Sequence, residues 1–194
     1  MLNFGKTLVV AAHPDDEVLG CGGLIAKLIN QGEQVRVVFI AEGSSCRYEA
    51  LNKQAQEEIN FRNQCSIEAL RSLGVSSHNF YNLPCGRLDK GSFIEIAKII
   101  EKEISDYKPT TVLTHSSNDV HNDHKIVCRA VVQATRPVGK IVKNLLSFEI
   151  LSSTEWNYKE TFKPNIFVDV TSTINAKINA MHCYSPEQPK PPHP

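Results

Sequence analysis

The chain of 194 residues carries 21 Lys and Arg residues against 21 Asp and Glu residues, so its formal net charge is zero. A hydrophobic content of 41% and a charged content of 22% are those of an ordinary globular protein. The chain lacks the basic excess of a nucleic-acid binder, and no apolar run approaches the roughly 18 residues that a membrane-spanning helix needs. With no export signal and six scattered cysteines, the sequence predicts one cytoplasmic domain over residues 1–194, with reduced thiols.

Short apolar runs alternate with longer amphipathic segments. In chain order they predict a strand over 7–12, a helix over 17–31, a strand over 34–40, a helix over 48–73, a strand over 78–83, a helix over 92–104, a strand over 110–115, a helix over 122–135, strands over 144–150 and 165–170, and a helix over 172–184. This order predicts an α/β, Rossmann-like three-layer fold with a mainly parallel sheet and helices on both faces. The Pro-rich residues 185–194 are expected to form an extended tail.

Polar clusters follow the first and the fourth predicted strands. The sequence "HPDDE" occupies residues 13–17, and "HSSNDVHNDH" occupies residues 115–124. In a doubly wound sheet these two strands lie side by side, and ligands bind at their carboxyl ends, where the strand order reverses. We therefore expect both clusters in one crevice, although about a hundred residues separate them.

The residue types in these clusters favour a metal ion. His13 and Asp16 are three residues apart in a predicted turn, and His121 and His124 are three apart on one predicted helical face. Zinc binds imidazole nitrogen and carboxylate oxygen readily, and a catalytic zinc uses three protein ligands and a water position. Four potential ligands therefore converge, one more than a catalytic zinc site needs.

Other interpretations of the same clusters remain open at this stage. Magnesium or manganese bound by Asp15, Asp16 and Asp119 would suit a metal-dependent phosphohydrolase. A sugar- or nucleotide-binding module that has lost catalysis is a third interpretation. The imidazoles favour zinc over magnesium, and Asp15, His121 and Asp123 argue against simple binding, which needs no base beside a metal.

The motifs "AAHPDDEVLGCGG" and "THSSNDVHNDH" together resemble those of the PIG-L (LmbE-like) superfamily. Members of that superfamily are zinc-dependent deacetylases of N-acetylglucosamine-type substrates. Further matches are "EGSSCR" at 42–47, "LPCGRLD" at 83–89, "SFEILSSTEW" at 147–156 and the closing "PHP". The resemblance thus spreads over essentially the whole chain, and it implies the release of acetate and a free amine from an amino sugar.

The resemblance also implies a role for each residue of the two clusters. Zinc would be bound by His13, Asp16 and His124. Asp15 would be the general base, and a protonated His121 would stabilise the developing oxyanion. Asp123 would orient His121 or tune its charge.

The substrate side is less defined. Arg47 is predicted to hold a phosphate or sugar hydroxyl, the alternative being a solvated loop arginine, and Glu149 matches a substrate-binding position of the family. Cys85 stands where many members have an aspartate that contacts substrate, which leaves the sugar open. The aglycone (lipid, nucleotide, inositol or sugar) and the oligomeric state, a homo-oligomer included, also stay open. Relatives usually continue beyond the position of Pro194, so whether the C-terminus is truncated stays open as well.

Overall fold

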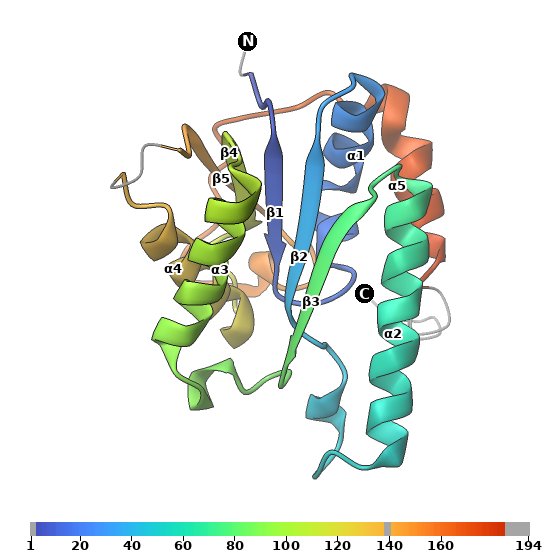
Figure 1. Cartoon of the computed structure of the whole chain (residues 1–194), viewed down its shortest axis with the longest axis vertical. Helices are drawn as coiled ribbons and strands as arrows, with labels where there is room; N and C mark the ends of the chain where they lie inside the picture. The colour runs from blue at the N-terminus through green and yellow to red at the C-terminus, as the bar shows by residue number, and fades with distance from the viewer. Residues whose placement is uncertain (1–2, 138–140, 185–194) are drawn as a thin grey trace.

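The computed structural model describes residues 3–137 and 141–184, and its centre is a parallel sheet of five strands (Figure 1). The strands are β1 (Thr7–Ala11), β2 (Val35–Ala41), β3 (Ser77–Leu83), β4 (Thr111–His115) and β5 (Asn144–Phe148). Their order is β3-β2-β1-β4-β5, with Val9 of β1 opposite Val37 on one side and Leu113 on the other. The first and fourth strands are therefore neighbours, as the sequence predicts.

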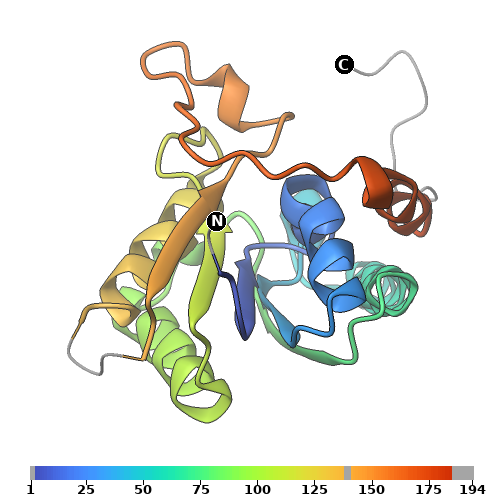
Figure 2. The ribbon, with the colours of Figure 1, turned by 90° about the horizontal axis from the view of Figure 1, so that it is seen from above.

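Helices cover both faces of this sheet. They are α1 (Asp16–Asn30), α2 (Lys53–Ser72), α3 (Phe93–Tyr107), α4 (Asn122–Ala134) and α5 (Ile174–His182). Figures 1 and 2 show α1, α2 and α5 on one face and α3 and α4 on the other. The predicted three-layer α/β fold is thus confirmed. None of the helices in the described part of the chain has both the length and the apolar character of a membrane span.

The central strand β1 is buried on both faces. Val9 and Ala11 belong to the core beneath α1, α2 and α5, whereas Leu8 and Val10 belong to the core beneath α3 and α4. All four side chains have no exposed surface. Burial on both faces explains why the strand reads as a continuous apolar run rather than an alternating one. The buried strand also holds the residues that follow β1 in a fixed position.

Two local signals shift element ends relative to the sequence prediction. The helix predicted from residue 48 begins at Lys53, because the Asn52 side chain accepts a 2.9 Å hydrogen bond from the Ala55 N–H and caps the first turn. Residues Ser45–Arg47 instead form a 3-10 turn, η1. The last helix is likewise preceded by a 3-10 turn, η4 (Thr171–Thr173). The predicted tail, 185–194, lies outside the described residues.

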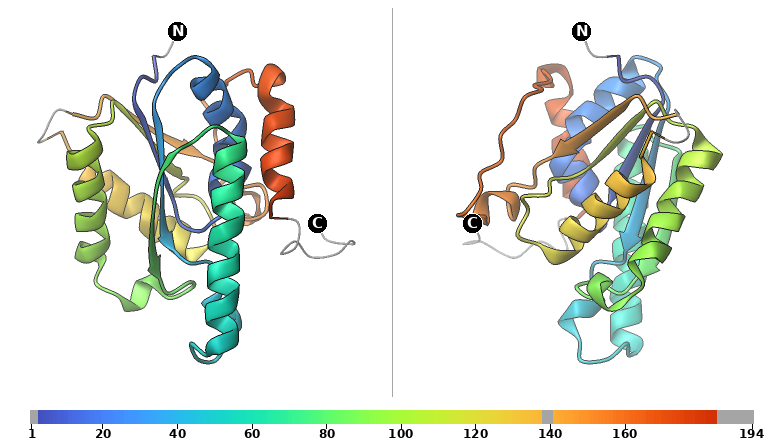
Figure 3. Two further views of the ribbon diagram at one scale, coloured as in Figure 1. Left: turned by 45° about the vertical axis from the view of Figure 1, so that its right-hand side comes forward. Right: turned by 90° about the vertical axis from the view of Figure 1, so that its left-hand side faces the viewer.

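The prediction of a strand over 165–170 is wrong, because this extended segment pairs with no strand in the described structure. It passes over helix α1 instead and leads into α5, as Figure 2 shows. The left-hand view of Figure 3 shows α1 and α5 side by side. The Lys27 ammonium donates a 2.7 Å hydrogen bond to the Asp169 carbonyl, and Val170 packs so closely on Gly23 that an added Cβ there would come within 3.0 Å. The apolar alternation of the segment therefore serves packing on a helix.

Candidate metal centre

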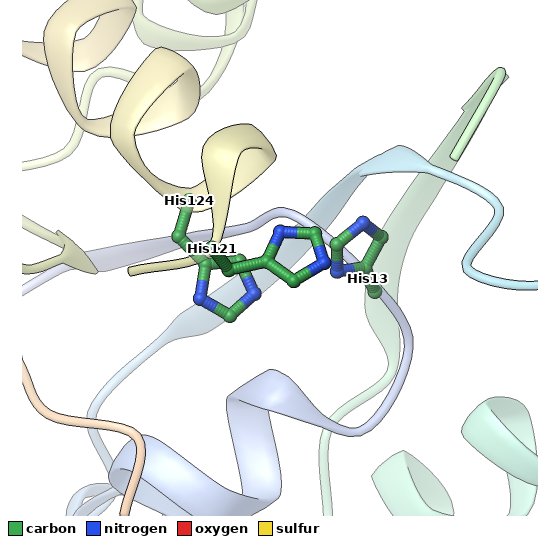
Figure 4. Close-up of side chains that lie close together, drawn as sticks. All are labelled: His13, His121 and His124. Atoms are coloured by element: carbon green, nitrogen blue, oxygen red, sulfur yellow. The ribbon is translucent and has the colours of Figure 1, made fainter. Parts of the chain in front are cut away.

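The ends of β1 and β4 bring the two predicted clusters together. The Thr114 hydroxyl donates to the Val10 carbonyl (3.1 Å), and the Ala12 N–H donates to His115 Nε2 (2.8 Å). Figure 4 shows the imidazoles of His13, which follows β1, and of His121 and His124, at the start of α4, pointing toward one another. The two clusters thus meet at the strand-order reversal, as expected.

Asp16 lies at the spacing of a tetrahedral metal site from both predicted histidine ligands. Asp16 Oδ2 lies 3.4 Å from His13 Nδ1 and 3.3 Å from His124 Nε2. Ligand atoms at the usual zinc distances are about 3.3 Å apart in a tetrahedron. All three residues are buried, so a cation bound among them would be shielded from bulk water.

Hydrogen bonds orient both imidazoles for this role. His13 Nε2 lies 3.0 Å from Asp123 Oδ2, and His124 Nδ1 lies 2.9 Å from Asp119 Oδ2. An imidazole that donates one N–H to a carboxylate directs the lone pair of its other nitrogen to the opposite side. In both rings that nitrogen is the one near Asp16. The carboxylates therefore select the tautomers that a metal ion requires.

Asp119 is a positioning residue that the sequence did not reveal in this role. Besides His124, its Oδ2 accepts hydrogen bonds from the hydroxyls of Ser153 (2.8 Å) and Thr154 (3.0 Å), and its Oδ1 accepts the His121 N–H (2.8 Å). Against burial, which alone would raise it, the hydrogen bond to His124 helps to lower the pKa of Asp119 to about 2. The sequence gives no sign of these bonds, because Ser153 and Thr154 lie more than thirty residues further along the chain.

Electrostatics at the cluster favour a cation. Burial alone would lower the pKa of His124, but the Asp16 carboxylate and the hydrogen bond to Asp119 raise it to about 9. The pKa of His13 is likewise raised well above its ordinary value, against burial, by Asp123 and Asp16. Without a metal, protons therefore neutralise the buried carboxylates, and a metal ion can replace them. The residues present thus fit a zinc ion.

His115 is close to the cluster but is not free to bind metal. Its Nε2 lies 3.4 Å from Asp16 Oδ2, yet that nitrogen already accepts the Ala12 N–H. Burial lowers the pKa of His115 to about 3, which keeps the ring neutral, and the ring stacks on His124 with 4.0 Å between centroids. These contacts make His115 a support for the His124 ring.

His121 caps helix α4 rather than lying on a helical face. Its backbone is extended, and its ring centroid lies 4.5 Å from that of His124 and 4.9 Å from that of His13. Burial and the two neighbouring imidazoles lower the pKa of His121, which makes a protonated ring at neutral pH unfavourable. A neutral ring still carries one N–H donor, and Nδ1 has no hydrogen-bond partner among the described residues.

Asp15 is held in a strained turn beside the predicted ligands. Its φ of 109° is rare for a residue with a side chain, and its N–H donates to Glu17 Oε2 (2.9 Å). Its carboxylate accepts a 2.8 Å hydrogen bond from Arg62 Nη2. Burial raises the pKa of Asp15 to about 6, although Arg62 acts in the opposite direction. Backbone strain of this kind is commonly found at functional sites.

Arg62 is a second residue that the sequence analysis missed. The buried guanidinium reaches across from α2 and also donates to the carbonyls of Pro14 (2.8 and 3.0 Å) and Gly43 (3.2 Å). It therefore joins the 13–16 turn to the loop after β2. A signal was present in the sequence: Arg62 occupies the buried stripe of α2, where its neighbours at helical spacing are Ile59 and Ser66.

Asp123 contacts His13 rather than His121, on which it acts only through its charge, in the direction that raises the pKa of His121. Its Oδ2 contacts His13 and accepts the Gly86 N–H (2.6 Å), and its Oδ1 accepts the Leu88 N–H (3.3 Å). No described hydrogen bond joins Asp123 to His121. The first turn of α4 faces the loop after β3, which supplies these N–H donors and directs the carboxylate toward His13.

The two predicted substrate residues lie outside the His and Asp cluster. Arg47 is half exposed, with its Nη1 3.6 Å from Glu58 Oε2. Glu149 follows β5 and lines a cavity of about 540 Å³ together with residues of α1 and of the 162–170 segment. The structure gives neither residue a contact with the cluster, so their roles remain predictions.

Comparison with known proteins assigns a family and a fold. The family model described as PIG-L, GlcNAc-PI de-N-acetylase, matches residues 8–135. The Escherichia coli K12 protein YaiS, described as an uncharacterized deacetylase, is 30% identical over 167 residues, which are 84% of this chain and 80% of YaiS. The 4-oxalmesaconate hydratase of Pseudomonas putida is 27% identical over 200 residues, 94% of this chain and 74% of the hydratase.

A solved structure shares the fold at lower identity. The N,N'-diacetylchitobiose deacetylase from Pyrococcus horikoshii superposes with a TM-score of 0.72 at 23% identity, over 97% of this chain and 72% of its own length. The family model covers both polar clusters and all five residues from His13 to Glu17. The chain therefore belongs to the PIG-L family of N-deacetylases.

Proposed function

We propose that this protein is a zinc-dependent hydrolase that removes the N-acetyl group from an N-acetylglucosamine-type substrate. The observation that carries the proposal is the placement of Asp16 Oδ2, 3.4 Å from His13 Nδ1 and 3.3 Å from His124 Nε2, with each ring oriented by its own carboxylate. Family membership supports the deacetylase chemistry. The six free cysteines fit a reducing, cytoplasmic location.

Zinc held by His13, Asp16 and His124 would supply a Lewis acid that polarises the acetamide carbonyl and makes water a nucleophile at neutral pH. The protein supplies the proton transfers. Asp15, beside the ligands and fixed by Arg62, would take a proton from the attacking water and pass it to the leaving amine. The N–H of a neutral His121 would donate to the developing oxyanion.

The different roles proposed for the adjacent carboxylates of Asp15 and Asp16 follow from their contacts. Asp16 is buried among three imidazoles, where burial alone would raise its pKa but the charge of His124 and its hydrogen bond to Asp16 lower it, so it stays ionised as a ligand. Asp15 points to Arg62, its side chain is 26% exposed, and its raised pKa of about 6 suits proton exchange near neutral pH.

A turnover screen tests the proposal directly. Purified protein with measured zinc content would be offered N-acetylated amino sugars that are free, phosphorylated, inositol-linked and lipid-linked, and acetate would be quantified. We expect acetate and free amine in equal amounts from at least one of these substrates. Parallel assays would use an unsaturated dicarboxylate, the kind of substrate a hydratase takes, and a phosphate monoester. Hydration or phosphate release without any deacetylation would overturn the proposal.

A further inference from the structure

Two thiols from loops far apart in the sequence meet at the edge of the metal centre. Cys46, in η1 (Ser45–Arg47), and Cys85, just after β3, have their sulfur atoms 3.2 Å apart. Cys46 is exposed, whereas only 3% of the Cys85 surface is accessible. Thirty-nine positions separate the two residues, so tertiary structure alone brings them together.

The backbone holds this pair in place. The buried Glu42 carboxylate accepts N–H groups from both loops, at 2.8 Å from Cys85 and at 2.6 and 2.9 Å from Ser44 and Ser45, and it also accepts the Ser45 hydroxyl. Next to Cys85, Gly86 has a φ of +68°, and a Cβ added to it would lie 3.1 Å from the Cys46 Cβ. The two loops therefore pack directly on each other, with Glu42 as a clamp between them.

The buried thiol is part of the surroundings of a predicted metal ligand. The Cys85 sulfur, a His13 ring nitrogen and an Asp123 carboxylate oxygen all lie within 4.8 Å of one another. The Gly86 N–H donates to the same Asp123 oxygen that contacts His13. Any displacement of Cys85 toward Cys46 is thus transmitted to the carboxylate that orients His13.

We propose that Cys46 and Cys85 are a modification site, at which a peroxide or a small-molecule disulfide forms a reversible disulfide bond that slows turnover at the metal centre. With hydrogen peroxide, the Cys46 sulfur takes one oxygen and releases water, and the Cys85 sulfur then displaces that oxygen as a second water. Two S–H bonds break, one S–S bond forms, and the peroxide accepts both electrons. With a small-molecule disulfide, the Cys46 thiolate displaces one small thiol to form a mixed disulfide, and the Cys85 thiolate then displaces the second small thiol. A dithiol reverses either reaction by exchange, in which its own two sulfur atoms form a disulfide.

The geometry suits this reaction and gives it a structural consequence. A disulfide bond is about 2.05 Å long, so the sulfur atoms need to approach by roughly an ångström. The bond would fix the 45–47 loop, which carries Arg47, against the loop after β3, and any movement of Cys85 would change its contacts with His13 and Asp123. Partial burial raises the pKa of Cys46 to about 11, so oxidation at neutral pH is expected to be slow and to require hours of incubation.

The test combines peptide mapping with activity on the zinc-loaded full chain. Protein would be incubated with hydrogen peroxide or oxidised glutathione, blocked with an alkylating agent, digested and analysed by mass spectrometry. We expect a peptide pair linked through Cys46 and Cys85, the loss of two hydrogen masses, and full reversal by dithiothreitol. Zinc content should stay constant while turnover falls and then recovers. The exposed position makes Cys46→Ser the informative variant, with Cys128→Ser, in the buried face of α4, as the matched control.

Each result is decisive. Cys46→Ser should lose both the linked peptide and the reversible inhibition, whereas Cys128→Ser should keep both. A linkage between other cysteines, or sulfinic acid at Cys46 with Cys85 still a thiol, would overturn the proposal. A Cys46–Cys85 disulfide with unchanged turnover would overturn the link to the metal centre. Because the mapping needs no substrate, failure of the deacetylase proposal is distinguishable from failure of this one.

Discussion

Asp123 Oδ2 lies 3.0 Å from Nε2 of His13, so the first turn of α4 fixes the ring that follows β1. Carboxylates of this kind hold a metal-binding imidazole in one tautomer, and their loss costs about 10- to 100-fold in metal affinity. We expect Asp123→Asn to weaken zinc binding by that factor, measured by competition with a chelator. Asp89→Asn, at an exposed position of the neighbouring loop, is the control and should leave the affinity unchanged.

The ligand assignment separates two histidines that stack on each other. His124→Ala should lose zinc at moderate chelator concentration, because it removes the nitrogen 3.3 Å from Asp16. His115→Ala should retain one zinc per chain, because His115 Nε2 is already occupied by the Ala12 N–H. Metal analysis after dialysis, with circular dichroism to verify folding, checks both variants. Zinc loss in His115→Ala with retention in His124→Ala would reverse the assignment.

Asp15→Asn tests the general base. Asparagine keeps the size of the side chain and an oxygen for the Arg62 hydrogen bond, but it cannot accept a proton. General base catalysis contributes about 10²- to 10⁴-fold, so kcat should fall by that factor with zinc content unchanged. If Asp15 were instead a ligand, zinc affinity would fall and excess zinc would restore activity. A zinc-loaded Asn variant with normal kcat would contradict the base assignment.

Arg62→Met tests how much the buried guanidinium stabilises the 13–16 turn. The substitution leaves the Pro14 and Gly43 carbonyls without their donor and the Asp15 carboxylate without its cation. Removing one partner of a buried ion pair costs about 3–5 kcal/mol, so a clear fall in the free energy of unfolding is expected in urea titrations. Arg71→Met, exposed on the same helix, should change this free energy very little. Equal effects of the two variants would contradict the proposal that Arg62 stabilises the 13–16 turn.

Glu42 should make stability depend on pH. Burial alone would raise its pKa, but hydrogen bonds from Ser45, Cys85 and Ser44 lower it below the ordinary 4.5. A folded-state pKa below the unfolded value means that the stabilisation is complete above pH 4.5 and is lost as the pH falls through the folded pKa. Glu42→Gln should therefore be less stable by about 2 kcal/mol at pH 7, with a smaller difference in acid.

Urea titrations from neutral to acid pH would measure this difference. Glu101→Gln, at an exposed position of α3, provides the matched control and should parallel the unsubstituted protein at every pH. A constant offset between Glu42→Gln and the unsubstituted protein across the whole range would show that the Glu42 charge contributes nothing to the pH dependence.

The sequence alone determined the fold class and the meeting of the two polar clusters at one edge of the sheet. Apolar runs of strand length alternating with amphipathic segments can be buried only in a layered α/β fold, and the parallel sheet then brings the ends of β1 and β4 together. The exception is residues 165–170, whose strand-like pattern serves packing on α1. A local pattern records which side chains are buried, but it does not record which element buries them.

Only the tertiary structure decided how the site residues act on one another. The contacts Asp123–His13, Asp119–His124, Arg62–Asp15 and Cys46–Cys85 join residues on different elements or on opposite sides of a turn, and their partners depend on side-chain direction. The same holds for charge: burial and two neighbouring imidazoles lower the pKa of His121, whereas the family resemblance implied a protonated ring. Hydrogen bonding and desolvation act through space over a few ångströms, and distance along the chain does not reveal which groups come that close.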